Sequence, residues 1–236
     1  MEKMNKIALL VDGDNAQSKL LNLVLEEASK YGKVTIRRVY GDWTTPQMNQ
    51  WKGQLNEMAF SPIQKFSYTS GKNSTDSALI IDAMDILHDG LVDGFCIVSS
   101  DSDYTGIARR IREDGIFVMG IGEKKTPNAF MKSCEIFTFV ENLEPKPEQS
   151  TKKEVHKKEK VTVDYKLISK AFDLSSNETN EAYVSNMGIN IRKLDPSFDS
   201  RTYGCKTLTQ LFSKLDEYVV VDNVVNGINN PLIKRK

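Results

Sequence analysis

The sequence predicts an α/β protein, built on a doubly wound, mostly parallel sheet and followed by a small winged-helix α+β domain. Apolar, β-rich runs alternate with stretches of helical periodicity from Lys6 to about Val140, which is typical of βαβ units. Runs such as 7–11 and 95–98 are continuously apolar, as expected for strands that helices cover on both faces. A second apolar pattern begins only after a charged segment that contains prolines.

The first domain is expected over residues 1–143. Strands are predicted at 6–11, 34–40, 62–67, 94–99, 116–121 and 136–140, and helices at 16–30, 46–58, 75–88, 103–113 and 127–132. In the helix at 75–88 the apolar side chains recur at helical spacing, and the helix at 103–113 ends at Gly115. Both helices are amphipathic, so their apolar stripes are expected to pack on the sheet.

Residues 144–161 are predicted to form a solvated, flexible linker, because they carry prolines and many charges but almost nothing to bury. The apolar pattern then returns over 162–236. Helices are predicted from Tyr165 to Phe172, from Ala182 to Ile191 and from Thr207 to Leu215, and strands at 217–222 and 231–233. This arrangement is typical of a small winged-helix domain.

Composition narrows the function classes. The 236 residues include 32 basic and 32 acidic ones, so any attraction to nucleic acid must come from local patches. Cys96, Cys134 and Cys205 are too widely spaced for a metal-binding pair or a disulfide framework, and Cys96 is expected to be a buried small hydrophobe. The first apolar run is too short for a signal peptide or a membrane span, which predicts a cytoplasmic protein with no membrane partner.

Acidic residues stand where predicted strands give way to turns. Asp12 and Asp14 follow the first strand, Asp101 and Asp103 follow the fourth, and Asp76 begins the helix that leads into the fourth. Sites in open parallel sheets lie beyond the carboxyl ends of the strands, where the strand order reverses. The three segments are therefore expected to surround one crevice.

Carboxylates crowded in this way repel one another unless a divalent cation neutralises them. The set predicts a Mg²⁺ or Mn²⁺ site, where one or two ions would activate a water and stabilise the leaving oxygen of a phosphodiester. The polar neighbours expected to hold waters or the scissile phosphate are Asn15, Thr75, Ser99 and Ser100. Helix capping is the alternative role for Asp14, Asn15, Ser74 and Ser102, and placement in a helix first turn is the alternative for Asp76 and Asp103.

Three motifs in combination resemble the NYN domain of the PIN-like ribonuclease superfamily: Leu9 to Asn15, Gly71 to Asp76 and Val98 to Tyr104. The resemblance covers about 5–142 and implies a Rossmann-like, PIN-like fold with helices on both faces of the sheet. It also implies a magnesium or manganese nuclease acting on RNA. The metal ligands and catalytic residues that it implies are Asp12, Asp76, Asp101 and Asp103, with Asp14 and Asn15 in support. The second motif is longer here by several polar residues.

The C-terminal region resembles an OST-HTH/LOTUS domain. The segments that carry the resemblance are 182–188, 196–204 and 208–211, and the stretch Phe198 to Gly204 is the most specific. This family implies a winged-helix module that binds RNA or docks to a protein partner. Phe198, Tyr203 and Leu208 are expected in its core, and the residues expected to be exposed for phosphate contacts are Arg192, Lys193, Arg201, Lys206 and Lys214.

Other side chains are candidates for substrate contacts. Lys72 lies four residues before Asp76 and is a candidate phosphate ligand, and Tyr104 either stacks a base or packs a helix on the sheet. Trp43 and Trp51 border the second helix and are either core residues or platforms for single-stranded RNA. Arg109, Arg110 and Arg112 form either a basic rim or an ordinary solvated helix face.

The sequence as a whole predicts a metal-dependent ribonuclease, endonucleolytic in the favoured version, acting on single-stranded or structured RNA. The principal alternative is a catalytically weak RNA-binding or adaptor protein. A phosphatase of the haloacid-dehalogenase type is a further alternative, since Asp12-Gly13-Asp14 is similar to its nucleophile motif, but Ala16 stands where that family has Thr or Val. His88 and His156 have no neighbouring nucleophile, so a Ser/His/Asp hydrolase is not expected.

Overall fold

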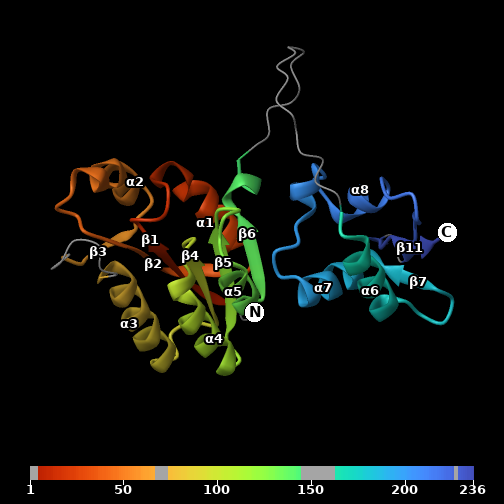
Figure 1. Cartoon of the computed structure of the whole chain (residues 1–236), viewed down its shortest axis with the longest axis horizontal. Helices are drawn as coiled ribbons and strands as arrows, with labels where there is room; N and C mark the ends of the chain where they lie inside the picture. Colours follow the sequence, from red (N-terminus) through yellow and green to blue (C-terminus); the bar gives the residue numbers. More distant parts are fainter. Residues whose placement is uncertain (1–4, 67–73, 145–162, 226–227) are drawn as a thin grey trace, which may run out of the picture. The chain divides into compact units, whose positions relative to one another are not determined.

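The computed structural model describes residues 5–66, 74–144, 163–225 and 228–236. The chain divides into two compact units, Met1–Pro145 and Lys146–Lys236, and each is described by itself (Figure 1).

The N-terminal unit is built on one sheet of six parallel strands. They are β1 (Lys6–Asp12), β2 (Lys33–Gly41), β3 (Ser61–Gln64), β4 (Gly94–Val98), β5 (Phe117–Gly122) and β6 (Ile136–Phe139), in the order β3-β2-β1-β4-β5-β6. The chain order therefore reverses between β1 and β4, which pair directly. The predicted doubly wound sheet is confirmed, and β3 ends at Gln64, short of the predicted position 67.

Helices cover both faces of this sheet (Figure 1). They are α1 (Leu21–Ser29), α2 (Lys52–Glu57), α3 (Ser74–His88), α4 (Thr105–Glu113) and α5 (Asn128–Ser133). Side chains of β1 alternate between two cores: Ile7, Leu9 and Val11 pack with residues of α1 and α2, whereas Ala8 and Leu10 pack with residues of α3, α4 and α5.

Three of the predicted helices have a 3-10 helix where their first turns were expected to be α-helical. Short 3-10 helices precede α1, α2 and α4: η1 (Ser18–Leu20), η2 (Pro46–Trp51) and η3 (Ser102–Tyr104). Gln17, Thr45 and Asp101 before them have extended backbones. The helical periodicity of the side chains spans both segments, which is why the sequence does not separate them.

The C-terminal unit packs three α-helices on a small antiparallel sheet. The helices are α6 (Tyr165–Ser175), α7 (Val184–Leu194) and α8 (Leu208–Phe212), and the sheet has the order β7 (Glu181–Tyr183), β11 (Leu232–Arg235), β8 (Tyr218–Val221). A short hairpin of β9 (Val224–Val225) and β10 (Ile228–Asn229) connects β8 to β11. The helical prediction for Ala182 and Tyr183 is wrong, because these residues pair with Ile233 and Leu232 of β11.

The Phe-Asp-x-Arg-x-Tyr-Gly stretch forms the 3-10 helix η5 (Ser200–Tyr203) and its caps. The Asp199 carboxylate accepts hydrogen bonds from the backbone N–H and the guanidinium of Arg201, and Gly204 ends the turn at a φ of 72°. Phe198 is buried against the ring of Tyr203, with centroids 5.5 Å apart. The predicted core role of Phe198, Tyr203 and Leu208 is confirmed, although the last two are only partly buried.

The remaining predictions about burial give mixed results. Cys96 is buried, as expected. Arg201 is half-buried beside Asp199, so its predicted exposure is wrong, whereas Arg192, Lys193, Lys206 and Lys214 are exposed as predicted. Within the described ranges, no helix combines the length and the apolar character that crossing a membrane would require.

Candidate functional site

The candidate site lies at the carboxyl edge of the sheet, where β1 and β4 end side by side. Val11 and Val98 are paired there, and Asp12, the last residue of β1, is fully buried. Side chains on a strand alternate between faces, so Asp12 follows Ala8 and Leu10 toward α3 and α4. The predicted adjacency of the two strand ends is confirmed.

Several donors hold the Asp12 carboxylate in place. Its Oδ2 accepts hydrogen bonds from Asn15 Nδ2 at 2.8 Å and from the Ser99 hydroxyl at 2.9 Å, and its Oδ1 accepts one from the backbone N–H of Asp14 at 3.2 Å. Burial raises the pKa of Asp12 above its usual value even though hydrogen bonds from Asn15, Ser99 and Tyr104 lower it, and the negative charge of Asp76 raises it further. The side chain is thus fixed in position, with a second carboxylate close enough to disfavour its charge.

Gly13, between the two aspartates, lies where a larger side chain would clash. The Gly13 N–H donates to the Tyr40 carbonyl on β2 at 2.8 Å. A Cβ on Gly13 would lie 2.7 Å from that same oxygen and 2.8 Å from Met48 Cε, which is closer than real Cβ contacts. The Asp-Gly-Asp sequence therefore allows the loop after β1 to lie against the end of β2.

Asp76 comes to the same edge from the first turn of α3. Its Oδ1 accepts a hydrogen bond of 2.7 Å from the hydroxyl of Tyr104, which is completely buried. Burial raises the pKa of Asp76, the Tyr104 hydroxyl lowers it, and the negative charges of Asp101, Asp103 and Asp14 raise it again. Since such charge effects act over short range, Asp76 is within electrostatic reach of carboxylates from both other segments.

The segment after β4 contributes Asp101 and Asp103. Asp101 caps η3, with its Oδ1 accepting from the Asp103 N–H at 2.9 Å, so the capping role considered for Ser102 belongs to Asp101. The Ser99 hydroxyl accepts from the Asp101 N–H at 3.1 Å while donating to Asp12. Ser99 therefore links the ends of β1 and β4.

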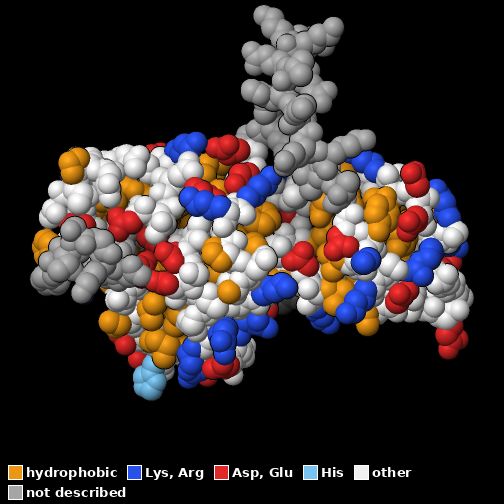
Figure 2. Space-filling model, viewed as in Figure 1, with side chains coloured by type: hydrophobic (Ala, Val, Ile, Leu, Met, Phe, Trp, Pro, Cys, Tyr) orange, Lys and Arg blue, Asp and Glu red, His pale blue; other side chains and the backbone are white. Residues whose placement is uncertain are grey.

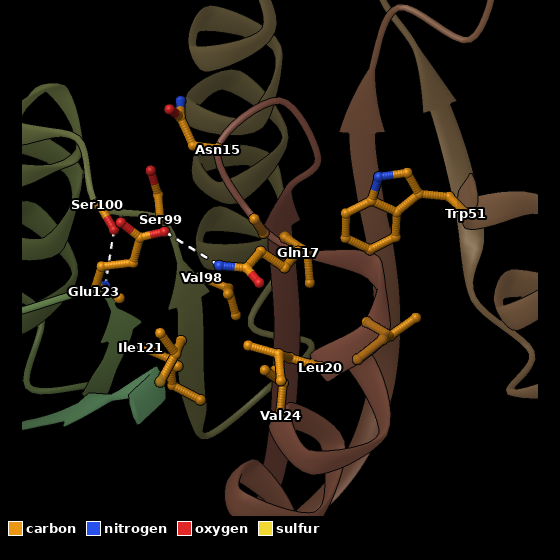
Figure 3. Close-up of a pocket in the computed structure, with 15 residues that line it drawn as sticks. Asn15, Gln17, Leu20, Val24, Trp51, Val98, Ser99, Ser100, Ile121 and Glu123 are labelled. Atoms are coloured by element: carbon orange, nitrogen blue, oxygen red, sulfur yellow. Dashed lines mark hydrogen bonds between the residues drawn. The ribbon is translucent and has the colours of Figure 1, made fainter. Parts of the chain in front are cut away.

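Threonine and serine hydroxyls complete the edge. Thr75 donates to Asp14 Oδ2 at 2.7 Å, which connects α3 to the loop after β1. Ser100 accepts from the backbone N–H of Glu123 at 2.9 Å and so ties β4 to β5. Asn15, Ser99 and Ser100 are among the residues that line a small cavity of about 20 Å³. In Figure 3 they lie above the apolar side chains Leu20 and Ile121, which line the same cavity. That volume is enough for about one water molecule.

The donor set has the chemistry that Mg²⁺ and Mn²⁺ prefer. Figure 2 shows acidic side chains grouped on one face of the N-terminal unit. Within the described residues, no three acidic, His or Cys side chains already form a metal cage. Mg²⁺ keeps several waters and uses only one or two carboxylates directly, so a set of carboxylates in mutual electrostatic contact fits it without a closed cage.

Some predicted contacts lie elsewhere or have other partners. Lys72 lies outside the described residues. Tyr104 is buried and bonded to Asp76, so the base-stacking alternative is wrong and the packing alternative is confirmed. Arg110 pairs with Asp114, and Arg112 pairs with Glu135 at 3.1 Å. All three arginines of α4 are exposed, as on an ordinary solvated helix face.

A set of polar contacts joins β2 to α3 and was not predicted from the sequence. The guanidinium of Arg38 and the hydroxyl of Tyr40 both donate to the Asp82 carboxylate, on the same helix as Asp76. Arg38 and Tyr40 are two residues apart and therefore face the same side of β2. The sequence signal that could have indicated these contacts is a pair of polar residues two apart on a strand, together with an acidic residue on the helix that covers it.

A six-stranded parallel sheet of this order, with carboxylates beyond the ends of β1 and β4, is consistent with a PIN-like α/β fold. Residues 6–143 match the NYN domain and residues 165–230 match the OST-HTH/LOTUS domain. The chain belongs to the NYN domain family and carries a C-terminal OST-HTH/LOTUS domain.

Several of the proteins that this chain resembles are described as uncharacterised or of unknown function. An uncharacterised protein of Methanocaldococcus jannaschii is 28% identical over 123 residues, which cover 50% of this chain and 48% of that protein. The chain thus spans about half the length of that curated relative. A crystal structure of a protein of unknown function from Vibrio parahaemolyticus aligns with a TM-score of 0.51 at 22% identity, covering 59% of this chain and 95% of the other. A solution structure of an uncharacterised protein from Nitrosomonas europaea is 27% identical, with a TM-score of 0.31, over 39% of this chain and 92% of the other.

Proposed function

We propose that this protein is a Mg²⁺- or Mn²⁺-dependent ribonuclease that hydrolyses phosphodiester bonds of RNA at the carboxyl edge of its parallel sheet. The observation that carries the proposal is the environment of Asp76: the neighbouring charges that raise its pKa are all carboxylates, and they come from the segments after β1 and β4. A fold that gathers like charges in this way loses stability unless a cation is bound there.

The ligands in this proposal are Asp12, Asp76, Asp101 and Asp103. A divalent cation bound by them would supply the positive charge that activates a water and stabilises the leaving oxygen. Asn15, Ser99 and the Asp14 backbone fix the orientation of the Asp12 carboxylate, and Tyr104 fixes that of Asp76. These donors reduce the reorganisation needed when substrate and cation bind.

The proposal also assigns contacts to RNA. Lys72 and Ser100 would meet phosphates beside the acidic edge, and the polar groups of Asn15 and Ser99 that do not contact Asp12 would meet substrate or water. In the second unit, Arg201 would contact RNA phosphates. Residues 162–236 would bind RNA or a protein partner, and the tether 144–161 would give the two domains an effective concentration on the order of millimolar.

The test is cleavage of end-labelled RNA by the full chain and by Asp101→Asn, each in Mn²⁺ and in EDTA. The proposal predicts cleavage by the wild type in Mn²⁺ alone. Asn at position 101 retains a side-chain oxygen that can cap η3 while removing the charge, so its folding is expected to persist and is checked by circular dichroism. Equal cleavage by the variant, or cleavage in EDTA, would show that the acidic edge is not the site.

One observation favours a second function, an RNA-binding or adaptor protein with weak catalysis. The described carboxylates lie near one another but do not form a closed three-ligand cage. RNA binding that is unaffected by EDTA, together with no cleavage in Mn²⁺, would select this function over the first.

A further inference from the structure

A second depression lies on the N-terminal unit, and none of the acidic residues of the candidate site lines it. Its volume is about 420 Å³, within the ~300–1,000 Å³ typical of ligand sites. The residues that line it come from the loop after β2, from α2 and from β3: Trp43, Lys52, Leu55, Asn56, Pro62 and Gln64.

Trp43 is held in place while it lines this depression. Its indole N–H donates to the Ile63 carbonyl at 3.0 Å, and its backbone N–H donates to Gln64 Oε1, also at 3.0 Å. The side chain is half-buried against the core beneath it. An indole fixed by its edge and packed from one side presents a preorganised surface for stacking.

The neighbouring side chains suit a nucleotide. Lys52 and Asn56 are exposed on α2, one turn apart, and supply a positive charge and an amide. Leu55 and Pro62 contribute apolar surface. An aromatic ring, an amide and a lysine are the groups that bind a base by stacking, read its edge and contact its phosphate.

Continuity of the backbone places the depression on the same edge of the sheet as the acidic residues. Gln64 ends β3 beside Gly41, which ends β2, and the Lys65 N–H donates to the Gly41 carbonyl at 3.1 Å. The Gly13 N–H donates to the Tyr40 carbonyl at 2.8 Å, so the end of β2 contacts the loop after β1 that carries Asp12 and Asp14. β3 is two strands from β1, about 10 Å at the usual strand spacing.

We propose that this depression, the Trp43 subsite, binds one base of single-stranded RNA a few nucleotides from the phosphate at the acidic edge, with the base stacked on Trp43 and Lys52 meeting its phosphate. This inference rests on the proposed function, since it assigns a place to the same substrate. It selects the platform role for Trp43, whereas Trp51 is buried in the core.

The test measures binding of fluorescently labelled single-stranded RNA to the full chain in EDTA, where the proposed cleavage is off. Replacing Trp43 by Leu removes the stacking surface, whereas Trp43→Phe keeps an aromatic ring and loses the same indole hydrogen bond. Trp43→Leu is expected to weaken binding roughly 5- to 100-fold, and Trp43→Phe much less. Lys52→Gln is expected to reduce the slope of the log binding constant against log salt concentration by the equivalent of about one phosphate contact.

An abasic scan locates the subsite along the strand. Each oligonucleotide in the scan lacks one base. Removing the base at one particular position is expected to weaken binding to the wild type, and the same removal should not change binding to Trp43→Leu. The proposal would be overturned if the wild type, Trp43→Leu and Trp43→Phe bound RNA with equal affinity. It would also be overturned if Trp43→Leu bound RNA normally but no longer bound a protein partner. Because the assay is independent of cleavage, Trp43-dependent binding without nuclease activity would contradict only the proposed function.

Discussion

The substitution Tyr104→Phe should distinguish an effect on the candidate metal site from an effect on the stability of the fold. The substitution removes one buried hydroxyl, which donates to Asp76 Oδ1 at 2.7 Å, and leaves the ring packing in place. Hydrogen bonds to charged groups contribute about 1.5–3 kcal/mol. At roughly 4 °C per kcal/mol for a unit of this size, the unfolding midpoint of the N-terminal unit should fall by about 6–12 °C.

The same substitution should weaken metal dependence. Tyr104 orients a proposed ligand and lowers its pKa, and loss of such a supporting donor typically reduces metal affinity about 10- to 100-fold. The Mn²⁺ concentration for half-maximal RNA cleavage should rise by that factor. Tyr40→Phe is the matched control, because it removes a buried hydroxyl that donates to Asp82 on the same helix. It should cost stability without changing the Mn²⁺ requirement, and an equal change in both variants would refute the reasoning.

The remaining predictions concern charge and packing at the edge. Asp76→Asn should raise the unfolding midpoint of the metal-free protein at pH 7, because burial and nearby carboxylates raise the folded pKa of Asp76 above its usual value of 3.8. A raised folded pKa means that this carboxyl contributes stability below pH ~3.8, and that the contribution is lost as pH rises through the folded pKa. The gain from Asp76→Asn should therefore shrink when unfolding is measured at successively lower pH, and a gain that is constant with pH would count against it. Gly13→Ala should cost about 1–3 kcal/mol in chemical denaturation and reduce cleavage, since its Cβ would meet the Tyr40 carbonyl, whereas Gly106→Ala in α4, where a Cβ meets nothing within 4 Å, should be neutral or stabilising. Similar losses in the two glycine variants would contradict the steric argument.

Much of the fold could be predicted because its signals are local. Strands buried on both faces are continuously apolar, and the helices between them keep a 3.6-residue period, so the doubly wound sheet follows from pattern alone. The errors fall where tertiary contacts decide. Ala182 and Tyr183 form a strand because β11 pairs with them, and β3 ends early at the point where its neighbour β2 also ends.

The candidate site was predictable in its acidic residues but not in the groups that support them. Asp12, Asp76, Asp101 and Asp103 follow from strand ends and topology. That Tyr104 bonds to Asp76, or that Ser99 links Asp12 to the Asp101 backbone, depends on rotamers and on side-chain packing across the edge. The sequence pattern carries no information about such pairings. It also does not show which of Trp43 and Trp51 is a core residue.

Calorimetric titration of Mn²⁺ into the full chain, without RNA, tests most directly the claim that the carboxylates gather to hold a cation. The account predicts saturable binding by the wild type and a large loss of affinity in Asp76→Asn, even though that variant is the more stable protein without metal. Bound Mn²⁺ at 100 times its dissociation constant would also stabilise the wild type by about 2.7 kcal/mol. No binding by the wild type at millimolar Mn²⁺, or equal binding by the variant, would contradict it.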